Sequence, residues 1–208
     1  MNIELAIISL TILIFSAIFH EIAHGLVADR LGDPTARLLG RLTLNPIPHI
    51  DPMMSILLPL LLLIGGSPVI FGAAKPVPVD PFNLREPKKD MALVSLAGPL
   101  TNFLIAVVVA FIFNFISPFI NEPLILATIY TIVQLNILLG VFNLIPIPPL
   151  DGSKILAMFL PEEMSKTYLS VGSIGIFILF FLLMPFSPIP LGQMLSNLLN
   201  FSMSLLGV

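Results

Sequence analysis

The chain has 208 residues, of which 57% are hydrophobic and only 10% are charged. A mean hydropathy of +1.05 excludes a water-soluble domain of this length, so we expect an integral membrane protein. The absence of cysteine excludes disulfides and thiolate metal sites, and nothing in the sequence suggests nucleic-acid binding.

The first apolar run covers about residues 3–27, which is enough for one spanning helix of roughly 20 residues. It ends in "FHEIAHGLVADRLGD", which holds two of the three histidines. On a helix His20 and His24 lie one turn apart on one face, so both imidazoles can reach one metal ion. Glu21, about 100° around the helix, completes the pattern H-E-x-x-H as a general base. Unpartnered ionisable groups are costly in a bilayer, which favours a metal site over chance.

Two polar stretches follow, with a short apolar segment between them. The residues "ARLLGRLTL" at 36–44 alternate loosely and predict a short β-hairpin. Met53–Ile64 contains Pro59 and is only about 12 residues long, which favours a re-entrant segment over a span. The second polar stretch, 73–90, is rich in proline, and we expect it to be extended.

Two further spans are predicted over Met91–Ser117 and Pro123–Leu150, because neither run contains a charge. The tight link "SPFINEP" joins them. Near the C-terminus Tyr168–Met184 is a good candidate span. Leu191–Leu206 is weaker, and the sequence leaves open whether it crosses the membrane or lies along the interface.

A zinc site normally takes a third protein ligand. Asp151 follows the uncharged Pro123–Leu150 run, where a proline-rich break opens the backbone. Irregular backbone at membrane depth is tolerated only when it is buried in protein or lines a wet cavity. We therefore favour Asp151 as the third ligand. His49 remains the alternative, and Asp151 could instead cap a helix N-terminus.

Three motifs occur in order: "HEIAH" at 20–24, "AGPLTN" at 97–102 and "NLIPIPPLDG" at 143–152. Together they resemble the site-2 protease family of intramembrane zinc metalloproteases. The resemblance covers about residues 12–154 and is closest to a compact bacterial and archaeal branch that lacks a PDZ domain.

The resemblance implies zinc as the cofactor, with the ligands His20, His24 and Asp151. It implies that Glu21 is the catalytic base and that Asn143 and Asn102 line the site and contact substrate. The implied reaction is hydrolysis of peptide bonds in transmembrane segments of membrane-anchored substrates, as in regulated intramembrane proteolysis. The expected partners are those substrates and the lipid bilayer; the oligomeric state is left open.

The fold we expect is an all-α polytopic membrane domain over residues 1–208. It has a three-helix catalytic core within about 3–154, further membrane helices over about 168–206, a re-entrant segment and a short β-hairpin. To share one metal ion, the His20 helix and the helix before Asp151 must run in the same direction. Met53–Ile64 then cannot cross, and all nine Lys and Arg residues fall on one side of the membrane. The positive-inside rule makes that side cytoplasmic, with the N-terminus outside and the zinc site nearer the cytoplasmic face of the cell membrane.

Three other functions compete with this reading. A membrane zinc protease of another family would use a glutamate as third ligand, yet Glu162 and Glu163 lie together in a polar loop. A metal transporter would need polar groups along a pathway, but the later spans have almost none. An inactive scaffold is disfavoured because Glu21 is intact.

Overall fold

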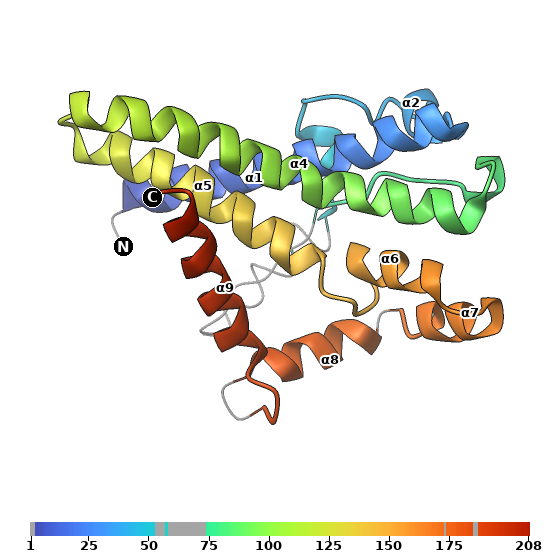
Figure 1. Ribbon diagram of the computed structural model, residues 1–208. Coiled ribbons are helices and arrows are strands. Elements are labelled where there is room, and N and C mark those ends of the chain that lie inside the picture. The colour runs from blue at the N-terminus through green and yellow to red at the C-terminus, as the bar shows by residue number, and fades with distance from the viewer. Residues whose placement is uncertain (1–2, 53–56, 58–73, 173, 185–186) are drawn as a thin grey trace.

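The computed structural model describes residues 3–52, 57, 74–172, 174–184 and 187–208, and over these residues its regular structure is entirely helical (Figure 1). The α-helices are α1 (Ile3–Leu31), α2 (Thr35–Leu38), α4 (Pro87–Ile116), α5 (Pro123–Asn143), α6 (Asp151–Phe159), α7 (Glu162–Ser170), α8 (Ile174–Leu183) and α9 (Leu191–Leu205). Short 3₁₀ turns are η1 (Ile47–His49), η3 (Pro81–Asn83) and η4 (Ser117–Phe119).

The helices α1, α4 and α5 lie side by side and form the centre of the molecule (Figure 1). Each is long and apolar enough to cross a membrane, which confirms three of the predicted spans. The small side chains of Ala106 and Ala110 on α4 pack against Val133 and Ile137 on α5, with Met203 of α9 completing this buried cluster. Small residues let helix backbones approach closely, which is how helices associate when lipid removes the hydrophobic drive.

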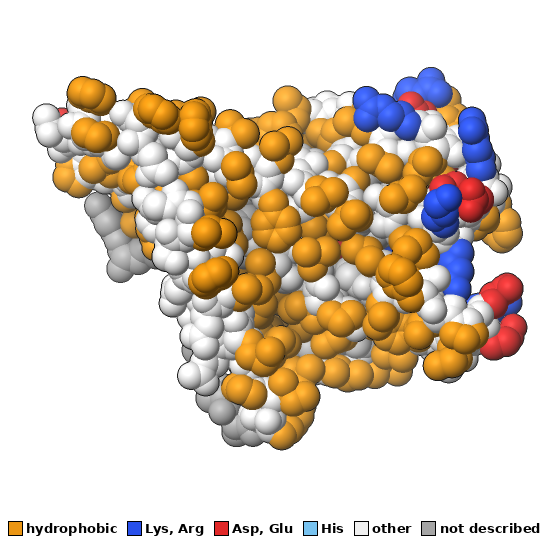
Figure 2. All heavy atoms as spheres, in the orientation of Figure 1, with side chains coloured by type: hydrophobic (Ala, Val, Ile, Leu, Met, Phe, Trp, Pro, Cys, Tyr) orange, Lys and Arg blue, Asp and Glu red, His pale blue; other side chains and the backbone are white. Residues whose placement is uncertain are grey.

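Positive charge is segregated to one end of this bundle. Figure 2 shows hydrophobic side chains over most of the visible face, with Lys and Arg gathered around α2, the start of α4 and α7. The N-terminus and the α4–α5 turn lie at the opposite end (Figure 1). The protein is therefore built as a multi-pass membrane protein with one basic end.

The later helices differ from the expected spans. Helix α5 ends at Asn143, well before Leu150, because the prolines that follow cannot continue a helix. The expected span Tyr168–Met184 is divided between α7 and α8, which meet at 71°. Helix α9 has 15 residues, about 22 Å of helix, which is shorter than the hydrocarbon core of a bilayer.

The β-hairpin predicted over residues 36–44 is not confirmed. Thr35–Leu38 forms α2, the N–H of Leu38 donates to the carbonyl of Pro34, and that of Arg41 donates to the carbonyl of Ala36. These local hydrogen bonds replace the cross-strand bonds that a hairpin needs, while Ala36 is buried against Gly25 of α1. The predicted re-entrant segment Met53–Ile64 lies outside the described residues, apart from Leu57.

Asp33 joins the two polar stretches just beyond α1. Its Oδ1 accepts hydrogen bonds from Thr35, through both the backbone N–H and the hydroxyl, and from Asn83 Nδ2 at 2.9 Å. Its Oδ2 accepts from the Asp80 N–H at 2.7 Å. Burial alone would raise the pKa of Asp33, but these hydrogen bonds outweigh it and hold the pKa below the ordinary value. The two stretches are thus fastened to the same end of α1.

We predict that Asp33→Ala lowers the free energy of unfolding by about 2–3 kcal/mol, because several donors lose their acceptor. Thermal unfolding in detergent measures this, with Asp29→Ala as the control, since Asp29 makes only a partly exposed ion pair with Arg37. Because the pKa of Asp33 is lower in the folded state, its ionised carboxylate stabilises the protein fully at pH values above the unfolded-state pKa of about 3.9. The stability difference between the parent and Asp33→Asn should therefore shrink as the pH falls below about 4. Equal unfolding temperatures for Asp33→Ala and the parent would contradict this role.

Candidate metal centre

His20 and His24 of α1 meet Asp151, the first residue of α6, in a buried group. His20 Nε2 lies 3.0 Å from Asp151 Oδ2 and 3.0 Å from His24 Nε2. His24 Nε2 lies 3.2 Å from the same carboxylate oxygen. Three potential ligand atoms from two helices therefore form a nearly equilateral triangle.

The opposite nitrogen of each imidazole is held by an acceptor. His24 Nδ1 lies 2.7 Å from the backbone carbonyl of Val94 on α4, and His20 Nδ1 lies 2.6 Å from Asn102 Oδ1. A carbonyl oxygen can only accept, so each Nδ1 must carry the proton. In the neutral imidazoles both Nε2 atoms then present lone pairs, which point toward each other and toward a carboxylate.

A chain of hydrogen bonds determines which end of the Asn102 side chain faces His20. Asn136 of α5 donates from Nδ2 to the Ile132 carbonyl at 2.8 Å and to Ser16 Oγ at 2.9 Å. Its Oδ1 is thus left to accept from Asn102 Nδ2 at 3.0 Å. The Asn102 oxygen must then face His20. Through Asn136 and Asn102, the Ile132 carbonyl on α5 thus determines which nitrogen of His20 carries the proton.

This donor set fits a zinc ion. Zinc–nitrogen distances of about 2.0–2.1 Å in a tetrahedral site place ligand atoms about 3.3 Å apart, close to the separations in the triangle. Three acceptor atoms at such distances repel one another unless a cation lies between them. Hydrogen bonds to the outer nitrogens of ligating histidines are also typical of zinc sites.

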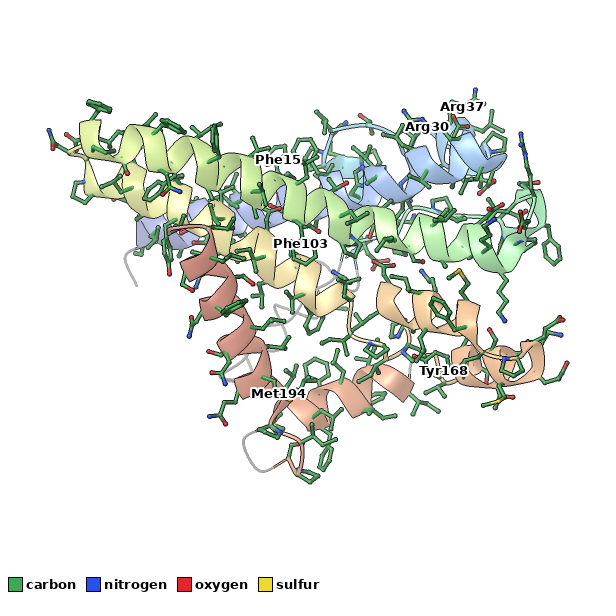
Figure 3. The ribbon with its side chains drawn as sticks, in the orientation of Figure 1. Phe15, Arg30, Arg37, Phe103, Tyr168 and Met194 are labelled. Atoms are coloured by element: carbon green, nitrogen blue, oxygen red, sulfur yellow. The ribbon has the colours of Figure 1, made fainter. Side chains whose placement is uncertain are left out.

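Asp151 is positioned by the irregular segment 144–150 between α5 and α6. A Cβ atom on Gly152 would lie 2.2 Å from the Leu144 carbonyl oxygen, so only glycine lets α6 start this close to the end of α5. Tyr168 of α7, labelled in Figure 3, donates its hydroxyl to the Pro146 carbonyl at 2.6 Å. Lys154 Nζ lies 3.5 Å from Asp151 Oδ1, the oxygen outside the triangle.

Glu21 lies beside the triangle on the wall of a cavity of about 390 Å³. Its Oε2 accepts a hydrogen bond of 2.7 Å from the backbone N–H of Val77. The three residues of the triangle, Asn143 and Lys154 also line this cavity. A carboxylate is therefore placed next to a candidate metal position, with room for a ligand.

The other sequence-predicted residues lie in different surroundings. Asn143 lines the cavity and uses one amide N–H on the Leu139 carbonyl of its own helix. Asn102 is fully buried behind His20, where its Oδ1 accepts a hydrogen bond from the imidazole. His49 is buried apart from the triangle, with Nε2 2.9 Å from the Thr43 carbonyl, and the alternative of His49 as third ligand finds no support here.

Sequence reasoning missed Ser16, Asn136 and Val94. Asn136 had a usable signal, because an amide side chain in an uncharged span needs a polar partner. Val94 had none, since it acts through a backbone carbonyl that every residue possesses.

A second cavity of about 550 Å³ lies between α5 and α9 and is lined almost entirely by apolar side chains. Phe103 and Met194, both labelled in Figure 3, belong to its wall. Its wall carries no titratable group, so we assign it no chemistry.

Gly98 of α4 provides the space for both imidazoles. A Cβ atom there would lie 2.5 Å from His20 Cε1 and 2.6 Å from His24 Cε1. We predict that Gly98→Ala weakens metal affinity by roughly 10-fold or more by displacing the rings. Alanine has a higher helix propensity than glycine, so propensity alone would make Gly98→Ala more stable to unfolding by up to about 1 kcal/mol.

Metal titration of the purified protein tests this prediction, with Gly192→Ala as the matched control. A Cβ atom on Gly192 would lie an ordinary 3.5 Å from the Leu183 carbonyl oxygen. Parental metal affinity in Gly98→Ala would show that the glycine is not needed for the histidine arrangement.

Comparisons with known proteins find zinc metalloproteases among the relatives of this chain. Among curated proteins, "Putative zinc metalloprotease YwhC" of Bacillus subtilis is 39% identical over 177 residues, covering 82% of this chain and 77% of that protein. "Putative zinc metalloprotease Rip2" of Mycolicibacterium smegmatis is 32% identical over 154 residues. "Zinc metalloprotease MJ0392" of Methanocaldococcus jannaschii is 31% identical over 156 residues. No solved structure matches the chain significantly.

The matched region covers 74% of this chain in both of the last two comparisons, but only 57% of the Rip2 protein and 35% of MJ0392. The sequence model of peptidase family M50 matches residues 6–186, a region that includes all three motifs and the whole triangle. These matches confirm the resemblance to the site-2 proteases, and the chain belongs to peptidase family M50 as a multi-pass membrane metalloprotease.

Proposed function

We propose that this chain is an intramembrane zinc peptidase that hydrolyses peptide bonds in transmembrane segments of membrane-anchored substrates. The observation that carries the proposal is the triangle of His20, His24 and Asp151, which shares one cavity with Glu21. The names of the relatives, which describe zinc metalloproteases, support the choice of metal.

His20, His24 and Asp151 would hold the zinc ion. When bound there, zinc supplies Lewis-acid chemistry, which acidifies water and polarises a carbonyl. The protein contributes fixed lone pairs: both Nδ1 atoms are engaged, so each ring is held in the tautomer that can coordinate.

Glu21 acts as the general base. It takes a proton from the attacking water and returns it to the leaving amine. Its Oε2 is engaged by the Val77 N–H, which leaves Oε1 to handle the proton. The shared cavity wall supports this assignment, because a base must lie within hydrogen-bond reach of the water it activates.

The substrate must present extended backbone, because a helix shields its own carbonyl groups. Extended residues around Val77 form one side of the cavity, and Pro149 and Leu150 line it as well. Asn143 has a second amide N–H beyond the one given to Leu139, and this donor can bind a substrate carbonyl.

The basic end of the molecule would face the cytoplasm, with the N-terminus outside. The hydrogen bonds of Asp33 with Asp80 and Asn83 support placing both polar stretches on one membrane face. The clustering of Lys and Arg at that end (Figure 2) then agrees with the positive-inside rule. The zinc site lies nearer this face than the N-terminus does.

We predict that Glu21→Gln keeps its metal and its fold but lowers peptide hydrolysis by at least about 10³-fold, because the amide cannot accept a proton. Cleavage of a model transmembrane substrate in detergent and metal analysis of the same preparation are the two measurements. The amide is nearly isosteric with the carboxylate, so Glu21→Gln removes the base without changing the shape of the side chain. Hydrolysis near the parental rate would remove Glu21 from this role.

The metal ligands are distinguished in the same assay. Asp151→Ala should lose both zinc and activity, whereas His49→Ala should keep zinc. Loss of zinc from His49→Ala together with full occupancy in Asp151→Ala would overturn the ligand assignment.

We predict that cysteines at positions 38 and 82 label from the cytoplasmic face and one at 121 from the opposite face. Leu38 and Phe82 are 74% and 96% exposed, and the chain has no native cysteine to interfere. An impermeant thiol reagent applied to intact cells and to inverted vesicles reads the sidedness. Labelling of positions 38 and 82 from different faces is incompatible with the proposed topology.

A further inference from the structure

The Glu21 carboxylate is held by a residue far away in the sequence. The N–H of Val77 lies in the extended segment 75–79 and donates to Glu21 Oε2 at 2.7 Å. The Val77 side chain also packs against α1, where a Cβ on Gly25 would lie 3.0 Å from Val77 Cγ1. This segment therefore contacts α1 through both its backbone and its side chain, within one turn of the metal-ligand histidines.

Arg41 also holds this segment, through its backbone carbonyls. One guanidinium nitrogen, Nη2, donates to the Lys75 carbonyl at 2.8 Å and to the Pro76 carbonyl at 3.2 Å. The N–H of Lys75 donates to the His49 carbonyl at 2.8 Å. Arg41 is only 7% exposed, and no carboxylate pairs with it among the described residues. Burying an unpaired guanidinium is costly, so its use on two backbone carbonyls needs an explanation.

The two prolines limit what the segment can do. Pro76 and Pro78 have no N–H, so Val77 is the only residue of 76–78 that can donate from its backbone, and it donates to Glu21. Alternating prolines make a poor edge for pairing with another strand. The segment is better suited to holding the carboxylate than to adding a substrate strand.

We propose that Arg41 is a positioning residue for peptide hydrolysis. It holds segment 75–79 so that the Val77 N–H fixes Oε2 of Glu21 and leaves Oε1 directed to the proton transfer. This inference rests on the proposed function of Glu21 as the base, and it adds a residue from outside the three sequence motifs.

Arg41→Met tests the inference in the full-length protein in detergent. We expect kcat to fall about 10- to 100-fold, while KM and zinc content stay within about twofold of the parent. Arg41→Lys retains a cationic donor and should recover part of kcat. Arg37→Met is the matched control, because Arg37 lies on α2 in an exposed ion pair with Asp29 and should keep the parental kcat. An unchanged kcat in Arg41→Met overturns the inference.

Hydrogen exchange at the Val77 amide provides a readout that does not depend on activity. In the parent this amide should be protected, and it should exchange faster in Glu21→Ala and in Arg41→Lys. If Arg41→Met fails to fold, Val77 exchange in Arg41→Lys tests the anchor directly, and a rate equal to that of the parent overturns the inference. Equal Val77 exchange in the parent and Glu21→Ala would mean that the contact is absent in solution and the inference is wrong.

The same experiments separate the two proposals. If Glu21→Gln cleaves at the parental rate, the proposed function itself fails. If Glu21→Gln is inactive while Arg41→Met and Arg41→Lys keep the parental kcat, only the role of Arg41 fails.

Discussion

The hydrogen bond between His20 Nδ1 and the Asn102 side-chain oxygen is the contact that suits the buried triangle to hold a metal ion. With the proton held on Nδ1, Nε2 of the neutral His20 ring carries a lone pair, and so does Nε2 of His24. Two lone pairs and a carboxylate oxygen within 3.0–3.2 Å are unfavourable without a cation. Reversing the Asn102 amide would place a donor against Nδ1 and remove this preference.

That orientation depends on how closely the three long helices pack. Asn102 reaches Asn136 and Ser16 only because α1, α4 and α5 meet at positions with small side chains. Gly98, one turn before Asn102, has no side chain to displace the imidazoles. The polar network is fully enclosed by apolar helices, where each unsatisfied group would be expensive, so the network and the packing require each other.

Irregular backbone at the basic end holds the two acidic groups of the candidate site in place. Asp151 follows a proline-rich break that Gly152 and Tyr168 hold in place, and Glu21 is held by the extended segment that Arg41 anchors. Spanning helices use their backbone N–H groups on their own hydrogen bonds and have no free N–H to offer, although a carbonyl such as that of Val94 can accept a second hydrogen bond. The N–H that holds Glu21 and the turn that positions Asp151 therefore come from irregular segments outside the spanning helices.

Much of this protein could be predicted from local pattern. The spacing of His20 and His24, the three long apolar runs and the position of Asp151 after a proline break are local features, because helix periodicity and proline sterics act over a few residues. The sequence also resembled the correct family. It did not predict α2 in place of a hairpin, the end of α5 at Asn143, or the parts played by Asn136, Arg41 and Val77. The parts played by Asn136, Arg41 and Val77 depend on contacts between residues 34 to 120 positions apart, several of them through backbone groups that every residue has, so only the tertiary structure could decide them.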